Sequence, residues 1–349
     1  MRLLEKTIAM IEDLDREIMK KARNRVDNLI KPPNSLGKLE DIAVQLAGIT
    51  KSTQPRVDKK TLIAMAADHG VYEEGVAGYP QEITVIQTLN MAKGLTGVCA
   101  LGRVSNTKIV PVDIGVKVDF DDDSGIINKK IRYGTNNMTK GPAMTRDEAI
   151  RAIEVGIEVT NEEIKKGANL IGTGEMGVTN TTASTAILSV LANIDPAEIT
   201  GRGAKLCDEG IKRKIKAIKT AIKINNIDPN DPIDVVSKVG GLEIAGMSGI
   251  ILSAAANNVP VVIDGYISTI SALIAFRLQP KAKKYIIPSH ASLENGAKKA
   301  SELLGVEPII NMNLCLGEGS GAVLTFPIID AACEMINNMP TFEELGMTI

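Results

Sequence analysis

Tryptophan is absent from the 349 residues of this chain, and aromatic residues make up only 3% of it. Such a chain has few rings on which bases could stack, which argues against a site for single-stranded nucleic acid. The formal net charge of −2 is too small to create a general attraction to nucleic acid or to anionic membranes. The sequence therefore predicts neither a nucleic-acid partner nor a membrane partner.

Cysteine pairs and long apolar runs are scarce as well. The four cysteines form no C-x-x-C pair, which is typical of reduced thiols, although Cys315 adjoins the stretch LGEGSG (316–321), where a role stays open. The first thirty residues are charged throughout and lack the apolar centre of a secretory signal. The most apolar stretch, 250–275, is interrupted by polar residues and a proline, which indicates helix, turn, strand and helix. We predict a cytoplasmic protein.

Patterns typical of metal centres and hydrolase triads are missing. The two histidines, His69 and His290, belong to no H-x-H or H-E-x-x-H pattern. The acidic run DFDDDSG (119–125) is interpreted as a solvated loop, with a metal-binding loop as the alternative. No G-x-S-x-G occurs, so an α/β-hydrolase would have no nucleophile elbow. We expect no bound metal.

Short apolar runs alternate with helical stretches along most of the chain. The runs predict buried strands at 61–67, 108–115, 169–174, 259–265 and 284–289. The periodicity between them predicts helices at 81–103, 146–166, 180–193, 203–225, 241–257, 268–277 and 292–304. Because strands that alternate with helices form right-handed βαβ units, we predict an α/β fold with a mostly parallel sheet and flanking helices.

The two ends of the chain have a different pattern. Residues 3–30 predict one amphipathic helix or two, which the prolines of KPPN (31–34) end. Asn34 or Ser35 is positioned to cap a following helix at 38–49. The stretch 326–349 returns to a helical pattern and could pack against the N-terminal helix. We therefore predict a main domain at 31–324 and a small helical domain from 1–30 with 325–349.

Polar, glycine-rich turns follow the predicted strands: ADHG, DIG, GTGEMG, IDGY and PSHAS. Ligands of open α/β sheets bind at the carboxyl ends of the strands. The turns therefore mark one rim of the sheet as the expected site, and both histidines belong to it.

The turn GTGEMG (172–177) has the G-x-G-x-x-G form and precedes a helix, which suits a phosphate site. Glu175 would repel the pyrophosphate of a dinucleotide, so that interpretation is disfavoured. In one alternative the helix start binds a single phosphate, with Asn180, Thr181 and Thr182 as donors, while Glu175 faces an uncharged or cationic part of the ligand. In the other, Glu175 is a capping residue.

The second glycine-rich turn, LGEGSG, carries Glu318 between two glycines. In a semi-dry site, desolvation would raise the pKa of this carboxyl towards that of a base useful at neutral pH. The alternative is a solvated glutamate in a loop. The residues themselves favour neither.

With these turns assembled, the sequence resembles the nicotinate-nucleotide:dimethylbenzimidazole phosphoribosyltransferases, which act in making the lower ligand of cobalamin. The motifs that carry the resemblance span nearly the whole chain: KPPNSLGKLE, AADHGVYEEGVAGYPQEIT, VDIGV, NMTKGPAMT, GTGEMGVTNTTAS, GRGAKL, VGGLEIAGMSGIILSAAANNVPVVIDGYIS and PSHASLENGAKKA…LGEGSGAVL. The resemblance implies a Rossmann-like sheet, a small helical domain from the chain ends, and a homodimer with its site near the subunit boundary. It also implies that no metal or organic cofactor is needed.

The resemblance also implies roles for individual residues. The catalytic glutamate of the family matches Glu318, a second acid matches Glu175, and Asp264 matches an active-site aspartate. The positions that match nucleotide- and phosphate-binding residues are Gly177, Val178, Asn180, Thr181, Gly203, Lys214 and Ser292. Those that match base-binding residues are Gly78, Tyr79, Ile86, Met176 and Leu316.

The implied reaction transfers the 5-phosphoribosyl group of nicotinate mononucleotide to an aromatic base. Nicotinate leaves as a neutral pyridine ring, so no acid is required, whereas the incoming base must lose a proton. Glu318 would accept that proton. Glu175 and Asp264 would offset the positive charge that develops on the ribose, and Lys214 would bind the phosphate.

The base-binding loop AGYPQEITVIQ (77–87) departs from the family. Gly78 and Ile86 stand where the family commonly has a serine and a glutamine, and Gln87, one position late, is expected to point about 100° away. We expect a less polar pocket that also accepts other benzimidazoles, purines or phenolics such as p-cresol. One alternative is a subunit of a heterodimeric phenol-using enzyme. More distant rivals are a nicotinamide-dinucleotide oxidoreductase and a non-catalytic nucleotide-binding subunit.

Overall fold

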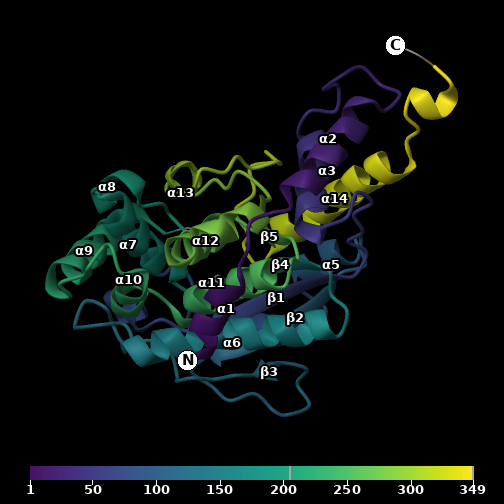
Figure 1. Cartoon of the computed structure of the whole chain (residues 1–349). Coiled ribbons are helices and arrows are strands. Elements are labelled where there is room, and N and C mark those ends of the chain that lie inside the picture. The colour runs from purple at the N-terminus through teal and green to yellow at the C-terminus, as the bar shows by residue number, and fades with distance from the viewer. Residues whose placement is uncertain (204–205, 348–349) are drawn as a thin grey trace.

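One parallel sheet organises the part of the chain that the computed structural model describes, residues 1–203 and 206–347. Its six strands have the order β3-β2-β1-β4-β5-β6, and every neighbouring pair is parallel (Figure 1). The strands are β1 (Lys60–Ala67), β2 (Lys108–Gly115), β3 (Ile127–Asn128), β4 (Leu170–Met176), β5 (Val261–Ile263) and β6 (Ile286–Pro288). This order is that of a doubly wound fold, and the predicted α/β class with a Rossmann-like sheet is confirmed.

The five predicted strands are all present, and β3, with two residues, is too short to show a pattern in the sequence. The central strands β1, β4 and β5 are buried on both faces, as parallel strands are, whereas the edge strand β3 is partly exposed. In β1, Ile63 and Met65 point into one core and Leu62 and Ala64 into the other. The near-continuous apolar runs follow from this double burial.

Helices cover both faces of the sheet (Figure 1). The larger core lies under α1 (Leu3–Met10), α6 (Arg146–Lys165), α7 (Asn180–Ala192), α9 (Asp208–Ile224), α10 (Pro232–Val239), α11 (Leu242–Ala256), α12 (Tyr266–Leu278) and α13 (Ala297–Leu304). The second core lies under α2 (Arg16–Asp27), α3 (Lys38–Thr50), α4 (Ile83–Ala92), α5 (Gly97–Gly102) and α14 (Ser320–Asn338). The remaining elements are η1 (Gly70–Glu74), α8 (Pro196–Ile199), η2 (Pro280–Tyr285) and η3 (Glu343–Leu345).

The expected helix at 81–103 is wrong in one important respect, because α4 ends at Ala92 and α5 begins at Gly97. Gly94 has a φ of +74°, the left-handed conformation that glycine commonly provides just past the end of a helix. The break directs the backbone N–H groups at the start of α5 towards the rim of the sheet.

The predicted cap of α3 is also wrong. Gly37 occupies the N-cap position, and no side chain caps the helix there. Asn34 instead adopts a φ of +58° within the turn that follows the prolines. The turn therefore depends on backbone conformations, not on a capping hydroxyl or amide.

The chain ends lie on both sides of the sheet. Helix α2 and the later part of α14 pack with α3 in the second core, whereas α1 packs against α6 and α11 in the larger core. The predicted domain boundary at 324/325 falls inside α14, whose first turns pack on β1, β4 and β5. The division into two domains stays a prediction.

Candidate active site

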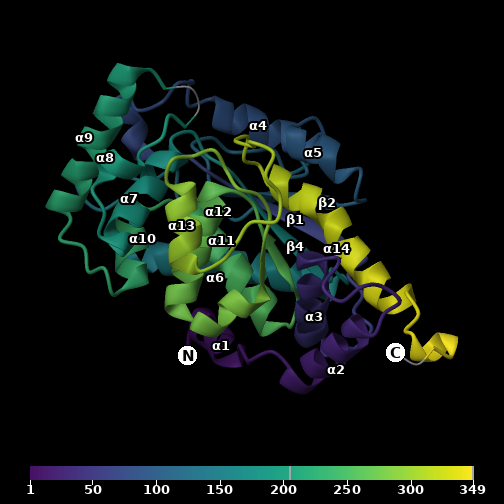
Figure 2. The same cartoon turned by 90° about the horizontal axis from the view of Figure 1, so that it is seen from above.

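The polar turns gather at the carboxyl ends of the strands, as expected for ligands of a doubly wound sheet. Glu175 lies at the end of β4, Asp264 directly follows β5, and Glu318 precedes α14. Figure 2 shows the start of α14 close to α4 and α5, above the sheet. Contacts between these turns bring the three acids into one buried cluster.

Glu318 is buried, with 5% of its surface exposed, although it belongs to a loop. Its Oε2 accepts the Val98 N–H at 3.1 Å and its Oε1 accepts the Gln87 side-chain amide at 3.2 Å. Burial raises the pKa of Glu318 above its ordinary value, and these two donors oppose part of the rise. The alternative of a solvated loop glutamate is therefore wrong.

The expectation that Gln87 points away from the site is wrong. Gln87 faces Glu318, and Asn90 Nδ2 donates to Gln87 Oε1 at 2.9 Å. Ile86 is instead 48% exposed. Packing against the sheet sets the rotation of α4 about its own axis and so decides which side chain faces Glu318. The position of a residue within the sequence motif does not specify that rotation.

Glu175 is buried at the centre of the cluster. Its Oε1 accepts the Glu318 N–H at 3.4 Å, and its Oε2 accepts the side-chain amide of Asn180. Burial, with the negative fields of Asp264 and Glu243, raises the pKa of Glu175 to about 8. At neutral pH this carboxyl therefore holds its proton in most molecules.

Asp264 contacts the beginning of α14 with both carboxylate oxygens. Oδ2 accepts the Gly319 N–H at 3.1 Å, and Oδ1 accepts the N–H groups of Gly321 and Ala322 at 2.7 and 3.3 Å. Burial raises the pKa of Asp264, whereas His290, with its Nδ1 3.7 Å away, lowers it. In this arrangement Asp264 caps α14 and fixes the turn that carries Glu318.

A second polar cluster lies at the start of α7. Lys214 Nζ donates to Thr181 Oγ1 at 2.8 Å and to the Gly201 carbonyl at 3.2 Å, and the Cα of Gly203 lies beside both side chains. Lys214 is almost completely buried, and this burial lowers its pKa to about 8. An anion bound here would raise the pKa of Lys214 again, because it favours the charged form.

The other residues that match phosphate-binding positions contact neighbours other than Lys214. The Val178 N–H donates to Thr84 Oγ1 at 3.1 Å, and the Asn180 amide is used by Glu175. Gly177 presses against His69, and Ser292 adjoins Gly265. Direct contacts in the structure therefore join Thr181, Gly203 and Lys214.

The predicted base-binding side chains are mostly at the surface of the rim. Tyr79, Ile86 and Leu316 are 44%, 48% and 59% exposed, Gly78 is exposed, and Met176 is half-buried. A Cβ added to Gly97 would lie 2.6 Å from Leu316 and 3.3 Å from Glu318 Oε2. Leu316 thus stands beside the carboxylate that the resemblance assigns as the base.

Three contributors have no counterpart among the residues predicted from the sequence, namely Asn90, Val98 and Glu243. Glu243 binds His69, with 2.7 Å between Oε1 and Nε2, and both side chains are fully buried. Burial alone would lower the pKa of His69, but Glu243 outweighs it and the pKa is raised. Glu243 is the second residue of α11, after Gly240, Gly241 and Leu242, and this acid just beyond a glycine pair is the one signal in the sequence.

Metal ligands and membrane spans are absent from the described part of the chain. No group of three His, Cys, Asp or Glu side chains that could hold a metal ion occurs in residues 1–203 and 206–347. Within those same ranges, no helix is both long and apolar enough to cross a membrane.

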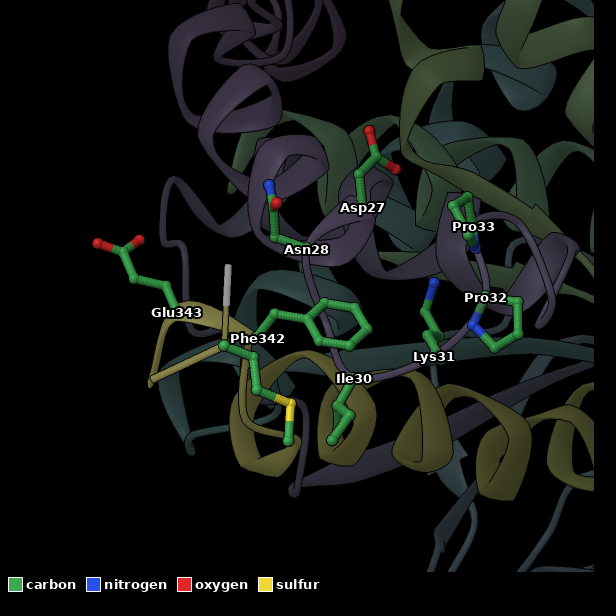
Figure 3. A pocket seen from close by; sticks show the side chains of 9 residues that line it. Asp27, Asn28, Ile30, Lys31, Pro32, Pro33, Phe342 and Glu343 are labelled. Carbon is green, nitrogen blue, oxygen red and sulfur yellow. The ribbon is translucent and has the colours of Figure 1, made fainter. Parts of the chain in front are cut away.

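An open surface pocket of about 860 Å³ lies between the end of α2 and the C-terminal segment (Figure 3). Lys31, Pro32 and Phe342 line it. The 19-residue α14 separates Phe342 from Glu318, a length of about 28 Å at 1.5 Å per residue. The pocket is therefore distinct from the acid cluster of this chain.

Comparison with protein families gives a match over nearly the whole chain. The phosphoribosyltransferase family model matches residues 11–347, and the chain belongs to this family.

Relatives extend over the whole chain. It is 70% identical, over 100% of both chains, to the nicotinate-nucleotide–dimethylbenzimidazole phosphoribosyltransferase of Alkaliphilus metalliredigens (strain QYMF). The enzyme of that name from Clostridioides difficile (strain 630) is 50% identical over 99% of each chain. The crystal structure of such an enzyme from Thermus thermophilus is 36% identical, with a TM-score of 0.91 over 96% of this chain and 100% of that one. A second structure, of CobT from the same organism, is 37% identical with a TM-score of 0.92 over 95% and 99%.

Proposed function

We propose that this protein transfers the 5-phosphoribosyl group of nicotinate mononucleotide to dimethylbenzimidazole. The names of the full-length relatives support this substrate pair. The observation that carries the mechanism is the buried carboxylate of Glu318, held by two donors at the rim of the sheet. A desolvated carboxylate in such a position suits a general base.

The reaction balances with one proton acceptor. A ring nitrogen of the base attacks C1 of the ribose, and the bond from C1 to the pyridinium nitrogen breaks with its electron pair staying on nicotinate. The proton on the other ring nitrogen of the base passes to Glu318. The products are nicotinate and an α-riboside phosphate of the base.

The supporting residues divide the remaining tasks. Lys214, with Thr181, would bind the phosphate, because a buried ammonium strongly prefers an anionic partner. The carboxyl oxygens of Glu175 would face the positive charge that develops on the ribose and offset part of it, with no proton transfer at this residue. Asp264 would also offset the positive charge on the ribose, and its hydrogen bonds to Gly319 and Gly321 fix the turn that carries Glu318.

The test is Glu318→Gln, which removes the base and keeps the shape of the side chain. We expect the rate of ribotide formation to fall by two or more orders of magnitude while nicotinate mononucleotide still binds, the scale of a lost general base. Single-turnover product analysis and ligand titration would measure the two effects. Near-normal turnover of this variant would remove Glu318 from the base role.

A second candidate concerns the base. Gln87 is engaged by Glu318 and Asn90, so it does not replace the polar side chain absent at Ile86. We propose that the pocket also accepts less polar bases, including phenolics. Equimolar dimethylbenzimidazole, adenine and p-cresol should give more than one ribotide with nicotinate mononucleotide. Exclusive use of dimethylbenzimidazole would refute this broader specificity and leave the main reaction intact.

A further inference from the structure

Gln87 has only one productive orientation in this site. Its Oε1 accepts a hydrogen bond from Asn90 Nδ2 at 2.9 Å, so its Nε2 must face Glu318 Oε1, 3.2 Å away. Asn90 lies one turn further along the same helix, α4, where residues three apart are neighbours. The direction of the amide is thus set within α4 and does not depend on a ligand.

The two oxygens of Glu318 are held by donors on different elements. Oε1 accepts from Gln87 on α4, and Oε2 accepts from the Val98 N–H on α5. Rotation of the carboxylate about its last bond would break both contacts. Each oxygen keeps a second lone pair, so a fixed carboxylate can still accept a proton from an incoming base.

The charged group beside Glu318 disfavours its anionic form. Asp264, from the turn after β5, raises the pKa of Glu318, whereas Glu175 of β4 contacts the Glu318 N–H. His290, after β6, faces Asp264 and not Glu318, and the titratable group that α5 contributes is the buried thiol of Cys99. Gln87 is therefore the side chain that favours the anionic form of Glu318.

We propose that Gln87, oriented by Asn90, is the positioning residue that fixes the carboxylate of Glu318 and keeps it available as a base. The proposal rests on the proposed function, since it assumes that Glu318 accepts the proton. A positioning role of this kind predicts changes in rate and in pH dependence, not in nucleotide binding.

The direct test is Gln87→Met, which keeps the length of the side chain and removes the donor. We expect kcat to fall about tenfold, the KM for nicotinate mononucleotide to stay within about twofold, and the acid limb of the kcat/KM profile to move to higher pH. The limb moves upward because removing a donor to the charged carboxylate makes it hold its proton more strongly. The same shift should persist in a Glu175→Gln background, which separates the titration of Glu318 from that of Glu175.

Asn90→Ala supplies the second arm. If Asn90 acts through Gln87, the double variant Gln87→Met/Asn90→Ala should be no slower than Gln87→Met alone, a non-additive cycle. Gln45→Met is the matched control, because it removes an amide of α3 that donates to the carbonyls of Lys284 and Ile286 and has no contact with Glu318. Its acid limb should not move.

The outcomes separate this proposal from the function it rests on. An unchanged acid limb in Gln87→Met, or fully additive effects of the two substitutions, would overturn the positioning role while Glu318→Gln stayed inactive. A Glu318→Gln variant with normal turnover would instead overturn the base assignment itself. Loss of structure in Gln87→Met is checked by its unfolding midpoint against Gln45→Met. Gln87→Glu, of nearly the same shape, replaces the neutral donor with a carboxylate, which should also move the acid limb to higher pH.

Discussion

Three buried carboxyl groups within one cluster differ because their partners differ. Asp264 accepts hydrogen bonds from three backbone N–H groups, and Glu318 accepts one from a backbone N–H and one from a side-chain amide. Glu175 accepts one from a side-chain amide and a longer one from a backbone N–H, and the negative fields of Asp264 and Glu243 act on it. The pKa of Glu175 accordingly rises to about 8. Residue type alone would have made the three equivalent.

Glu175→Gln should therefore stabilise the unliganded protein at neutral pH. The folded state holds the Glu175 proton up to about pH 8, whereas the unfolded chain loses it above the ordinary value of 4.5. Stability due to this group thus falls as pH rises from 4.5 to 8. The variant removes this pH dependence, and we expect its free energy of unfolding to exceed that of the wild type by roughly 2–3 kcal/mol at about pH 7.

Denaturant unfolding at several pH values measures this difference. The gain should shrink towards pH 4.5, where the unfolded wild-type chain also begins to hold the proton. A gain that is the same at every pH would show that Glu175 does not hold the proton.

Lys214→Met should weaken nucleotide binding with little effect on the chemical step. A buried ammonium whose pKa is lowered to about 8 is charged below that pH and neutral above it. For the wild type, the KM for nicotinate mononucleotide should rise as pH passes about 8, because the phosphate then loses its cationic partner. The variant should show a KM raised about 10- to 100-fold at neutral pH, as for a lost charge-assisted hydrogen bond. Its KM should not rise further as pH passes about 8, because the titrating lysine is gone. A flat KM in the wild type would contradict this.

At the scale of elements, the glycines of GTGEMG have a packing role. A Cβ on Gly174 would collide with the backbone carbonyl of Glu318, and one on Gly172 would meet the side chains of Phe326, Leu62 and Ala322. These glycines let the start of α14 cross β4 at close range. The pattern that suggested a dinucleotide cradle arises from contact between two elements.

Gly174→Ala and Gly172→Ala form a matched pair on β4. The first added methyl meets backbone, so the turn of Glu318 must shift, and we expect kcat to fall about 100-fold, as for a misplaced catalytic group. The second meets flexible side-chain atoms, so we expect a loss of about 1–3 kcal/mol in unfolding free energy with kcat kept. Equal activities of the two variants would contradict this assignment.

At the scale of the whole molecule, apolar side chains remain exposed beside the site. Ile86 lies on α4, Leu95 lies between α4 and α5, and Leu316 lies beside Gly97 of α5. Exposed apolar groups gathered in one region mark contact surfaces. We propose that a second copy of this chain covers them, which agrees with a homodimer whose boundary lies near the site.

Leu95→Asp tests this arrangement. Sedimentation equilibrium should show a dimer for the wild type and a dissociation constant raised at least about tenfold for the variant, since a buried charge is costly. Met10→Asp is the control, because Met10 is similarly exposed at the end of α1, against the other face of the sheet. A monomeric wild type would refute the homodimer and direct attention to a heterodimer with a related chain.

Sequence patterns predicted the sheet well and the site in part. The strands were found because parallel strands are apolar on both faces, and Glu175 and Glu318 were found because an acid interrupts a glycine-rich turn. Gln87 was misplaced because its role depends on the rotation of α4, and Glu243 was missed because its partner, His69, lies 174 residues away. Contacts at such separations are set by tertiary packing.

The sequence by itself determined the alternation of buried strands and helices, and hence the edge of the sheet at which a site must lie. The tertiary structure alone decided which side chains meet there. Glu318 lies 143 residues from Glu175 and 231 from Gln87, yet it contacts both. The local sequence pattern shows which side of one helix or strand is buried. The groups that set the pKa of a buried carboxyl belong to other helices, strands and turns, and only tertiary packing brings them into contact.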